Sequence, residues 1–230
     1  LVHAFGKALL FLSAGSITHG TKETDILRMR GIRKRMPITT FTFAIGILSL
    51  GGLPPLSGFF SKEEILLSIL SGRADIFIIL ALLATLLSAL YMARLFYIVV
   101  FGKLAKGNEK VKESPLLITI PLILLATFTM VLGLLGFIFT GWSEAFNGLE
   151  TTFHIELGPA STKIWLTSLS IILVIFSFIL GYIIYIQEPI SSIKITKKLG
   201  WAYKLVKNKY YLDEILQLAI EKFVIGFSEV

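Results

Sequence analysis

Five long apolar segments, separated by charged loops, constrain the fold of this chain more than any other feature. They cover residues 1–19, 39–70, 75–101, 115–139 and 163–186. A helix needs roughly 20 residues to cross about 30 Å of hydrocarbon, and each interior segment reaches that length. With 55% hydrophobic and 16% charged residues, the chain is too apolar for an ordinary water-soluble domain. We therefore predict an all-α polytopic membrane helix bundle of about five transmembrane segments, followed by a C-terminal amphipathic helix.

The distribution of lysine and arginine predicts the orientation of the chain. If all five segments cross the membrane, 16 of the 22 basic side chains fall in the loops of one side, and only Arg73 and Lys163 fall on the other. Membrane proteins retain positive loops on the cytoplasmic side. We expect a multi-pass protein of the cell membrane, in a prokaryote the cytoplasmic membrane, with cytoplasmic basic loops. Topology explains the basic charge, so no nucleic-acid partner is expected.

The tail after the last segment has the pattern of an amphipathic helix. Its sequence LDEILQLAIEKF, residues 212–223, places apolar side chains at helical spacing and charged ones largely on the other face. We predict a helix that lies on the cytoplasmic surface. It either binds lipid headgroups or lies along a neighbouring subunit, and the pattern fits both.

The second apolar segment contains a predicted break. Its 32 residues exceed one straight crossing. Pro54 and Pro55 remove two backbone donors, at about 3 kcal/mol or more for each proline inside a helix. We expect the first half-helix to end near Gly51. Ser61 and Glu64 have the spacing of a capping box, which predicts that a second half-helix begins with Ser61 as its N-cap.

Lys62 would then lie in the first turn of the second half-helix, at membrane depth. Interrupted backbone is tolerated there only where it is buried in protein or lines a water-filled cavity, so the break predicts a hydrated pocket. A lysine costs roughly 2.5–3.5 kcal/mol at the centre of a membrane helix and usually marks an ion or proton path. The negative charges of Glu63 and Glu64 favour the charged form of the lysine, whereas the positive end of the helix dipole favours its neutral form. A lysine between such influences can serve as a proton relay.

A simpler interpretation of this lysine stays open. Lys62 would only extend to the non-cytoplasmic surface, while Glu63 and Glu64 cap the helix. The helix break around Pro54 and Pro55 favours the relay.

The first segment contains a second pair of titratable residues at membrane depth. His3 and Lys7 are four residues apart and share one helix face, which Ala14 and Thr18 continue. Histidine titrates near neutral pH, so the pair can pass a proton through intervening water more readily than either residue alone. A lone helical histidine is more often a hydrogen-bonded core residue, but the neighbouring lysine favours the functional interpretation.

No redox centre is expected within the chain. It contains no cysteine, which excludes disulfides, thiolate metal sites and cysteine-ligated iron–sulfur clusters. We predict no catalytic residue, no cofactor site and no metal site here. Any redox centre must belong to a partner.

Four stretches of the chain closely resemble one known family. They are HAFGKALLFLSAGS, MPITTFTFAIGILSLGGLPPLSGFFSKEEIL, YMARLFYIVVFGK and NKYYLDEIL. The chain resembles the antiporter-like large subunit of respiratory complex I, subunit 5 or L, of a superfamily shared with multisubunit Na+/H+ antiporters and membrane-bound hydrogenase-type complexes. The resemblance covers most of the chain in the expected order.

The resemblance implies a proton-translocating module of inverted helical repeats, of which this chain would be the second half plus C-terminal helices. The family's histidine and lysine match His3 and Lys7, and the lysine of its GFFSK motif matches Lys62. Gly6 stands where the family often has a second aromatic residue, a departure that should alter packing more than chemistry. The glutamate and lysine pair of the first half lies outside this chain.

The resemblance also suggests three divisions of the chain. Residues 1–101 would form the second half of the ion-translocating module, with a truncated first helix, the broken helix 39–70 and the helix 75–101. Residues 102–186 would form two further transmembrane helices. Residues 187–230 would contain a cytoplasmic basic loop and the start of an amphipathic lateral helix.

The implied function is ion translocation in a NADH:quinone oxidoreductase-like complex. Electron transfer in other membrane and peripheral subunits would drive proton, or sodium, movement through this subunit. His3 and Lys7 would pass the proton laterally, and Lys62 would exchange it with the non-cytoplasmic side. Iron–sulfur clusters, flavin or quinone are expected only in partner subunits.

Two other interpretations fit the same residues. The chain could belong to a multisubunit Na+/H+ antiporter without redox chemistry, which would bring no iron–sulfur or flavin subunit on purification. It could also be a membrane scaffold whose polar residues only hold subunits together, in which case neutralising them would leave transport intact.

Overall fold

The computed structural model describes residues 2–71, 75–138, 160–187, 200–201, 204–205 and 208–220. Contacts divide the chain into two units, Leu1–Gln187 and Glu188–Val230. Every element in the described residues is helical, which confirms the predicted all-α class. The long helices of the first unit are α1 (Val2–Thr21), α2 (Pro37–Gly51), α3 (Ser57–Ser71), α4 (Asp75–Leu95), α5 (Leu116–Ile138) and α7 (Ala160–Tyr185).

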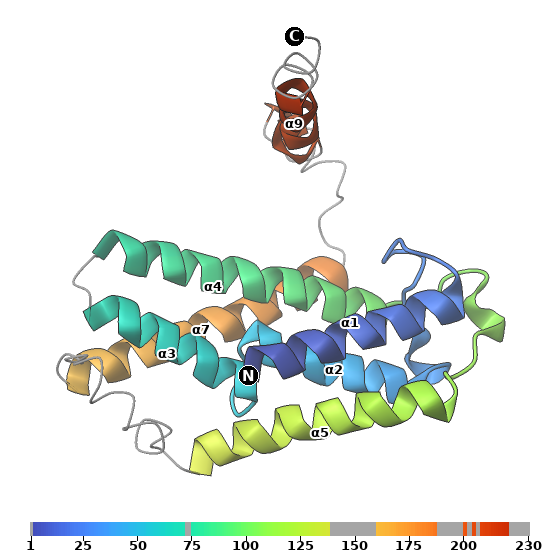
Figure 1. The fold of residues 1–230 in the computed structure, drawn as a ribbon, viewed down its shortest axis with the longest axis horizontal. Coiled ribbons are helices and arrows are strands. Elements are labelled where there is room, and N and C mark those ends of the chain that lie inside the picture. The colour runs from blue at the N-terminus through green and yellow to red at the C-terminus, as the bar shows by residue number, and fades with distance from the viewer. Residues whose placement is uncertain are drawn as a thin grey trace, which may run out of the picture. The chain divides into compact units, whose positions relative to one another are not determined.

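These helices run side by side as one bundle (Figure 1). Helix α2 contacts α1, α3, α4 and α5, and α7 packs mainly on α4. The last turns of α4 continue directly into a π-helix, η2 (Phe96–Phe101). Buried side chains of α1, α2, α4, η2 and the loop before α2 form the largest apolar cluster in the described residues, Ile17, Met29, Ile32, Met36, Phe43, Ile47, Met92, Val99 and Val100.

Three helical stretches in the described part of the chain are long and apolar enough to cross a membrane: Ile76–Phe101, Leu116–Gly136 and Ile164–Tyr185. They correspond to the last three predicted crossings. Helix α1 has 20 residues but carries charge, and α2 and α3 have 15 residues each. At 1.5 Å per residue, 15 residues span only about 22 Å, so α2 and α3 each fall short of a crossing. Together, α2 and α3 correspond to the predicted interrupted crossing.

The break between α2 and α3 begins where the sequence predicts it. Helix α2 ends at Gly51, and Gly52 follows with φ 87°, a left-handed conformation that glycine adopts without strain. The amide of Gly52 donates to the carbonyl of Ser49 at 2.9 Å. Pro54 and Pro55 lie in the five residues that separate the two helices.

The predicted start of the second half-helix is wrong by five residues, because a Ser61 N-cap would make Lys62 the first helical residue. Helix α3 begins at Ser57, so Ser61 is not an N-cap and lies inside the helix, where its hydroxyl donates to the carbonyl of Gly58 at 3.1 Å. Lys62 is therefore in the second turn and not the first. The helix starts early because the end of α2 holds it: the amide of Gly58 donates to the hydroxyl of Ser49 at 3.0 Å.

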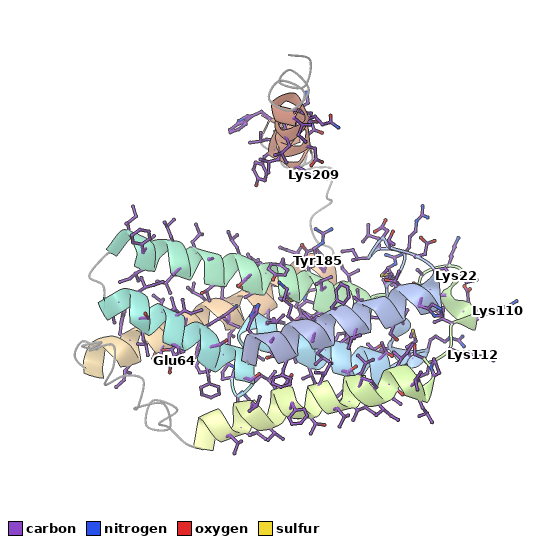
Figure 2. The ribbon with its side chains drawn as sticks, viewed as in Figure 1. Lys22, Glu64, Lys110, Lys112, Tyr185 and Lys209 are labelled. Carbon is purple, nitrogen blue, oxygen red and sulfur yellow. The ribbon has the colours of Figure 1, made fainter. Side chains whose placement is uncertain are left out.

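Two basic loops meet at one end of the bundle, as the predicted topology requires. The side-chain amide of Asn108 donates to the carbonyl of Arg28 at 2.7 Å, and the backbone amide of Ala105 donates to the carbonyl of Arg30 at 3.3 Å. Figure 2 shows Lys22, Lys110 and Lys112 at this end. Most of the third predicted basic segment, residues 187–210, lies outside the described residues.

The second unit contains a short 3-10 helix, η4 (Lys209–Tyr211), and helix α9 (Leu212–Ile220). The predicted amphipathic helix is thus confirmed up to Ile220, and residues 221–223 lie outside the described part. Lys209 donates to Asp213 at 2.9 Å, and this hydrogen bond raises the pKa of the Lys209 ammonium above its usual value.

Candidate functional site

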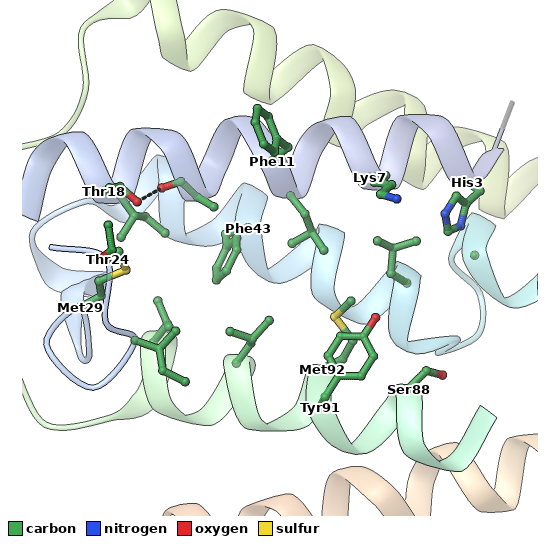
Figure 3. Close-up of a pocket in the computed structure, with 18 of the residues that line it drawn as sticks. His3, Lys7, Phe11, Thr18, Thr24, Met29, Phe43, Ser88, Tyr91 and Met92 are labelled. Carbon is green, nitrogen blue, oxygen red and sulfur yellow. Dashed lines mark hydrogen bonds between the residues drawn. The ribbon is translucent and has the colours of Figure 1, made fainter. Parts of the chain in front are cut away.

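A cavity of about 590 Å³ lies between α1 and α4, with α2 and α3 along its floor. Figure 3 shows side chains of α1 facing those of α4 across it. One end is polar, and the remainder is mainly apolar, with Leu10, Phe43 and Leu95 among its lining residues. The polar end gathers residues from three helices, His3, Lys7, Ser61, Lys62, Ser88 and Tyr91.

The Lys62 side chain crosses from α3 to the two neighbouring helices. Its ammonium donates to the hydroxyl of Ser88 on α4 at 2.9 Å and to the carbonyl of Gly51 at 3.4 Å. Gly51 is the last residue of α2, where helix carbonyls lack partners and the helix dipole is negative. The break thus provides both the space and the acceptor for this lysine.

Ser88 can accept this hydrogen bond because its own hydroxyl hydrogen is donated to another group. Its hydroxyl donates to the carbonyl of Thr85 at 2.9 Å, which leaves a lone pair facing Lys62. The contact therefore stabilises the charged form of the lysine.

His3 and Lys7 line the same polar end from α1, and Ala14 and Thr18 continue along the cavity as the spacing predicts. Both His3 and Lys7 are exposed in this chain. Figure 3 shows the Lys7 ammonium and the His3 ring directed from α1 toward the space in front of α4. The three residues singled out in the sequence, His3, Lys7 and Lys62, thus share one cavity.

The two glutamates after Lys62 point away from this cavity. Glu63 accepts hydrogen bonds from Thr167 and Ser170 of α7, the second at 3.3 Å. Glu64 is exposed (Figure 2). Neither lines the cavity, so the expected direct influence of these carboxylates on the proton of Lys62 has no support in the geometry. Glu63 instead joins α3 to α7.

The sequence analysis missed the residues of α4. Thr85, Ser88 and Tyr91 recur every third residue in an otherwise apolar segment, which puts them near one helix face. This polar stripe was the signal that could have identified the wall opposite α1.

The titratable groups that line the cavity are ones that can exchange protons. Its titratable side chains are two lysines, a histidine and a tyrosine, and no carboxylate is among the lining residues that the structure describes. No group of three or more potential metal ligands occurs in the described ranges either. Amines and imidazoles exchange protons through short chains of water and hydroxyl groups.

Comparison with known proteins identifies the family. A family profile described as "NADH:quinone oxidoreductase/Mrp antiporter, TM" matches residues 1–88, the part that contains His3, Lys7 and Lys62. The chain is 34% identical to subunit 5 of the chloroplast NAD(P)H-quinone oxidoreductase of Chlorokybus atmophyticus, over 96% of the chain. It is 32% identical to NADH-quinone oxidoreductase subunit L of Rickettsia felis, again over 96% of the chain. The chain belongs to this family of antiporter-like membrane subunits.

A third relative shows a similar match. NAD(P)H-quinone oxidoreductase chain 5 of Picosynechococcus is 30% identical over 94% of the chain. The matched relatives are named as subunits 5 and L, which confirms the resemblance seen in the four sequence stretches. This antiporter-like chain spans only 36–37% of the length of these relatives.

Proposed function

We propose that this chain carries protons across the membrane through the cavity at the broken helix. It would do so as one membrane subunit of a NADH-quinone oxidoreductase, in which electron transfer elsewhere drives the movement. The observation that carries the proposal is the gathering of His3, Lys7 and Lys62 on one cavity, with the Lys62 ammonium held at the break.

The geometry supports a role for Lys62 as the group that loads and releases the proton. Ser88 and the carbonyl of Gly51 stabilise its charged form, and an approaching positive charge on Lys7 would favour release. His3 and Lys7 would pass the proton along α1 to the break. Lys62 would then exchange it with the non-cytoplasmic side, with the basic loops in the cytoplasm.

The lining favours protons over sodium as the transported ion. Sodium requires several oxygen ligands and would meet like charges from Lys7 and Lys62 in this cavity. A proton needs only a lone pair on an amine or imidazole. Toward the basic loops the lining becomes apolar at Leu10, Phe43 and Leu95, which would hinder free water flow from that end.

The rest of the machinery would lie in partner subunits. Iron–sulfur clusters would bind to other subunits, because this chain has no cysteine to ligate them. Flavin and quinone would bind to other membrane and peripheral subunits as well, as the family resemblance implies. We assign residues 1–101 to the second half of the translocating module, 102–186 to two further crossings and 187–230 to the basic loop and lateral helix.

The test is the replacement Lys62→Met in the assembled complex. Methionine keeps most of the length of the side chain but cannot hold a proton. We expect proton pumping, measured with a pH-sensitive dye in proteoliposomes, to fall by about tenfold or more, the effect of removing an essential proton carrier. Electron transfer should persist or be slowed through coupling.

The matched control is Lys106→Met, which removes an exposed lysine from a loop. It should leave pumping and electron transfer unchanged. An unchanged proton-to-electron ratio in Lys62→Met would contradict the proposal.

The second candidate is a Na+/H+ antiporter subunit, because the description of the matched family profile also includes the Mrp antiporters. Such a chain would carry the same lysines and helices. Purification of the native complex separates the two, since flavin and iron–sulfur subunits accompany only the oxidoreductase.

A further inference from the structure

A second groove lies between α2 and α5 and shares no lining residue with the cavity of His3 and Lys62. Its volume is about 400 Å³. It is lined by Pro37, Ile38, Phe41, Thr42, Ile45, Ile123, Ala126, Thr127 and Met130. Several of these side chains are exposed, among them Phe41 at 64% and Ile123 at 46%, so the groove opens on the outside of the bundle.

The surface of the groove is apolar despite its two threonines. The hydroxyl of Thr42 donates to the carbonyl of Thr39 at 3.0 Å, and that of Thr127 donates to the carbonyl of Ile123 at 2.8 Å. Each hydroxyl donor is thus satisfied within its own helix. The groove therefore accommodates hydrocarbon better than a polar ligand.

The groove begins at the basic end of the bundle, where α2 and α5 both start. Glu113, just before α5, accepts from the amide of Ile38 at 2.7 Å and from the hydroxyl of Thr39 at 2.6 Å. This contact fixes the two helix starts beside each other. It also occupies amides at the N-terminus of α2, so an anion at this end must be bound by side chains.

Basic side chains are available at this mouth. Arg35 precedes Pro37 by two residues, and Lys112 comes directly before Glu113; both are exposed. Figure 2 shows Lys112 at the end where α5 begins. The Glu113 charge is already engaged with the start of α2. Exposed basic residues that flank the starts of the two helices lining an apolar groove match a molecule with an anionic head and a hydrocarbon tail.

The volume of the groove indicates whether an acyl chain or a helix can occupy it. A helix with its side chains is about 10 Å wide and rises about 5.4 Å per turn, so about 400 Å³ accommodates roughly one turn. A transmembrane partner helix would not sink into it, whereas a flexible acyl chain can follow it. We propose that this groove binds one acyl chain of an anionic phospholipid, whose headgroup meets Arg35 and Lys112.

The test uses photoactivatable lipids in nanodiscs that hold the complete complex. Phosphatidylcholine discs receive a trace of phosphatidylglycerol or of phosphatidylcholine with the same diazirine-bearing acyl chain. Mass spectrometry then maps the label on α2 and α5. Two basic residues at a membrane surface predict a preference for the phosphatidylglycerol probe on the order of tenfold.

Two kinds of variant locate the binding. Thr127→Trp fills the groove and should remove labelling by either probe, while Leu124→Trp, on an exposed part of α5 outside the groove, should change nothing. The double variant Arg35→Gln, Lys112→Gln should lower the phosphatidylglycerol signal to that of phosphatidylcholine.

Either of two results overturns the proposal. Equal labelling by both probes in the unchanged protein would mean bulk lipid only. Absence of label from the groove, with label elsewhere on the complex, would mean that a protein surface covers it. If Thr127→Trp fails to assemble, the double variant decides alone, since it changes only exposed side chains.

Discussion

At the scale of single residues, a side chain of α3 binds the C-terminal end of α2 across the break. The Lys62 ammonium reaches the carbonyl of Gly51, at the negative end of α2. A residue in the second turn of one half-helix is thereby tied to the last turn of the other. The interruption costs backbone hydrogen bonds, and the lysine recovers part of this cost by its bond to the free carbonyl.

The contact between Ser88 and Lys62 yields a prediction. A hydrogen bond to a charged group contributes roughly 1.5–3 kcal/mol, so Ser88→Ala should make Lys62 load a proton less readily and slow pumping by about tenfold. The measurement is the initial rate of proton uptake in proteoliposomes at matched electron-transfer activity.

Ser177→Ala is the matched control for this variant. Ser177 is fully buried, and its hydroxyl contacts the carbonyl of Leu86 on α4, but it does not line the cavity of Lys62. Equal losses in the two variants would mean that Ser88 matters only for packing.

At the scale of elements, local signals explain where helices end better than where they begin. Gly52 and the two prolines stop α2 by their own backbone geometry, so the sequence reveals that boundary. The start of α3 depends on Ser49, whose hydroxyl accepts from the amide of Gly58. A contact between two helices leaves no local pattern, and the Ser61 motif therefore suggested a start that the fold does not use.

The residues of the candidate site could likewise be predicted from local sequence, but their contacts with other helices could not. Charged residues in apolar segments stand out, so His3, Lys7 and Lys62 could be identified from sequence. Their shared cavity, the Ser88 acceptor and the turn of Glu63 toward α7 depend on how helices pack. Spacing along one helix does not specify its neighbours.

The packing of α5 against the break gives the prediction at this scale. A Cβ on Gly133 would overlap the backbone carbonyl of Pro55, whereas one on Gly15 of α1 meets nothing within 4 Å. Gly133→Ala should therefore push α5 from the break and destabilise the complex by about 1–3 kcal/mol. Gly15→Ala, the control, should be neutral or slightly stabilising.

Thermal unfolding of the purified complex in detergent measures this difference. The Gly133→Ala complex should unfold several degrees below the unchanged protein, and its pumping should fall if the break has moved. Equal midpoints for the two alanine variants would show that α5 does not support the break.

At the scale of the whole first unit, polar and apolar regions are divided along the bundle. The two basic loops lie at one end, where Asn108 in the loop before α5 donates a hydrogen bond to Arg28 in the loop before α2. The polar end of the cavity is at the break, and apolar side chains such as Phe43 lie between. Under the proposed function, the positive loops would orient the protein and the break would admit water, so the same charge pattern would serve topology and transport.

The central claim is that the cavity around Lys62 contains water while the outer face of α4 contacts lipid. These 230 residues contain no cysteine, so an introduced cysteine supplies the one thiol among them. Mass spectrometry of this chain then reports the modification of that thiol. Lys62→Cys and Leu87→Cys form the test pair, because Leu87 is 55% exposed on α4 outside the cavity.

The deciding measurement is the rate at which a charged, membrane-impermeant methanethiosulfonate modifies each thiol in the reconstituted complex. We expect Lys62→Cys to react rapidly and Leu87→Cys to resist, because a charged reagent enters water and not hydrocarbon. Resistance of both thiols would mean a dry cavity around Lys62 and would contradict the account.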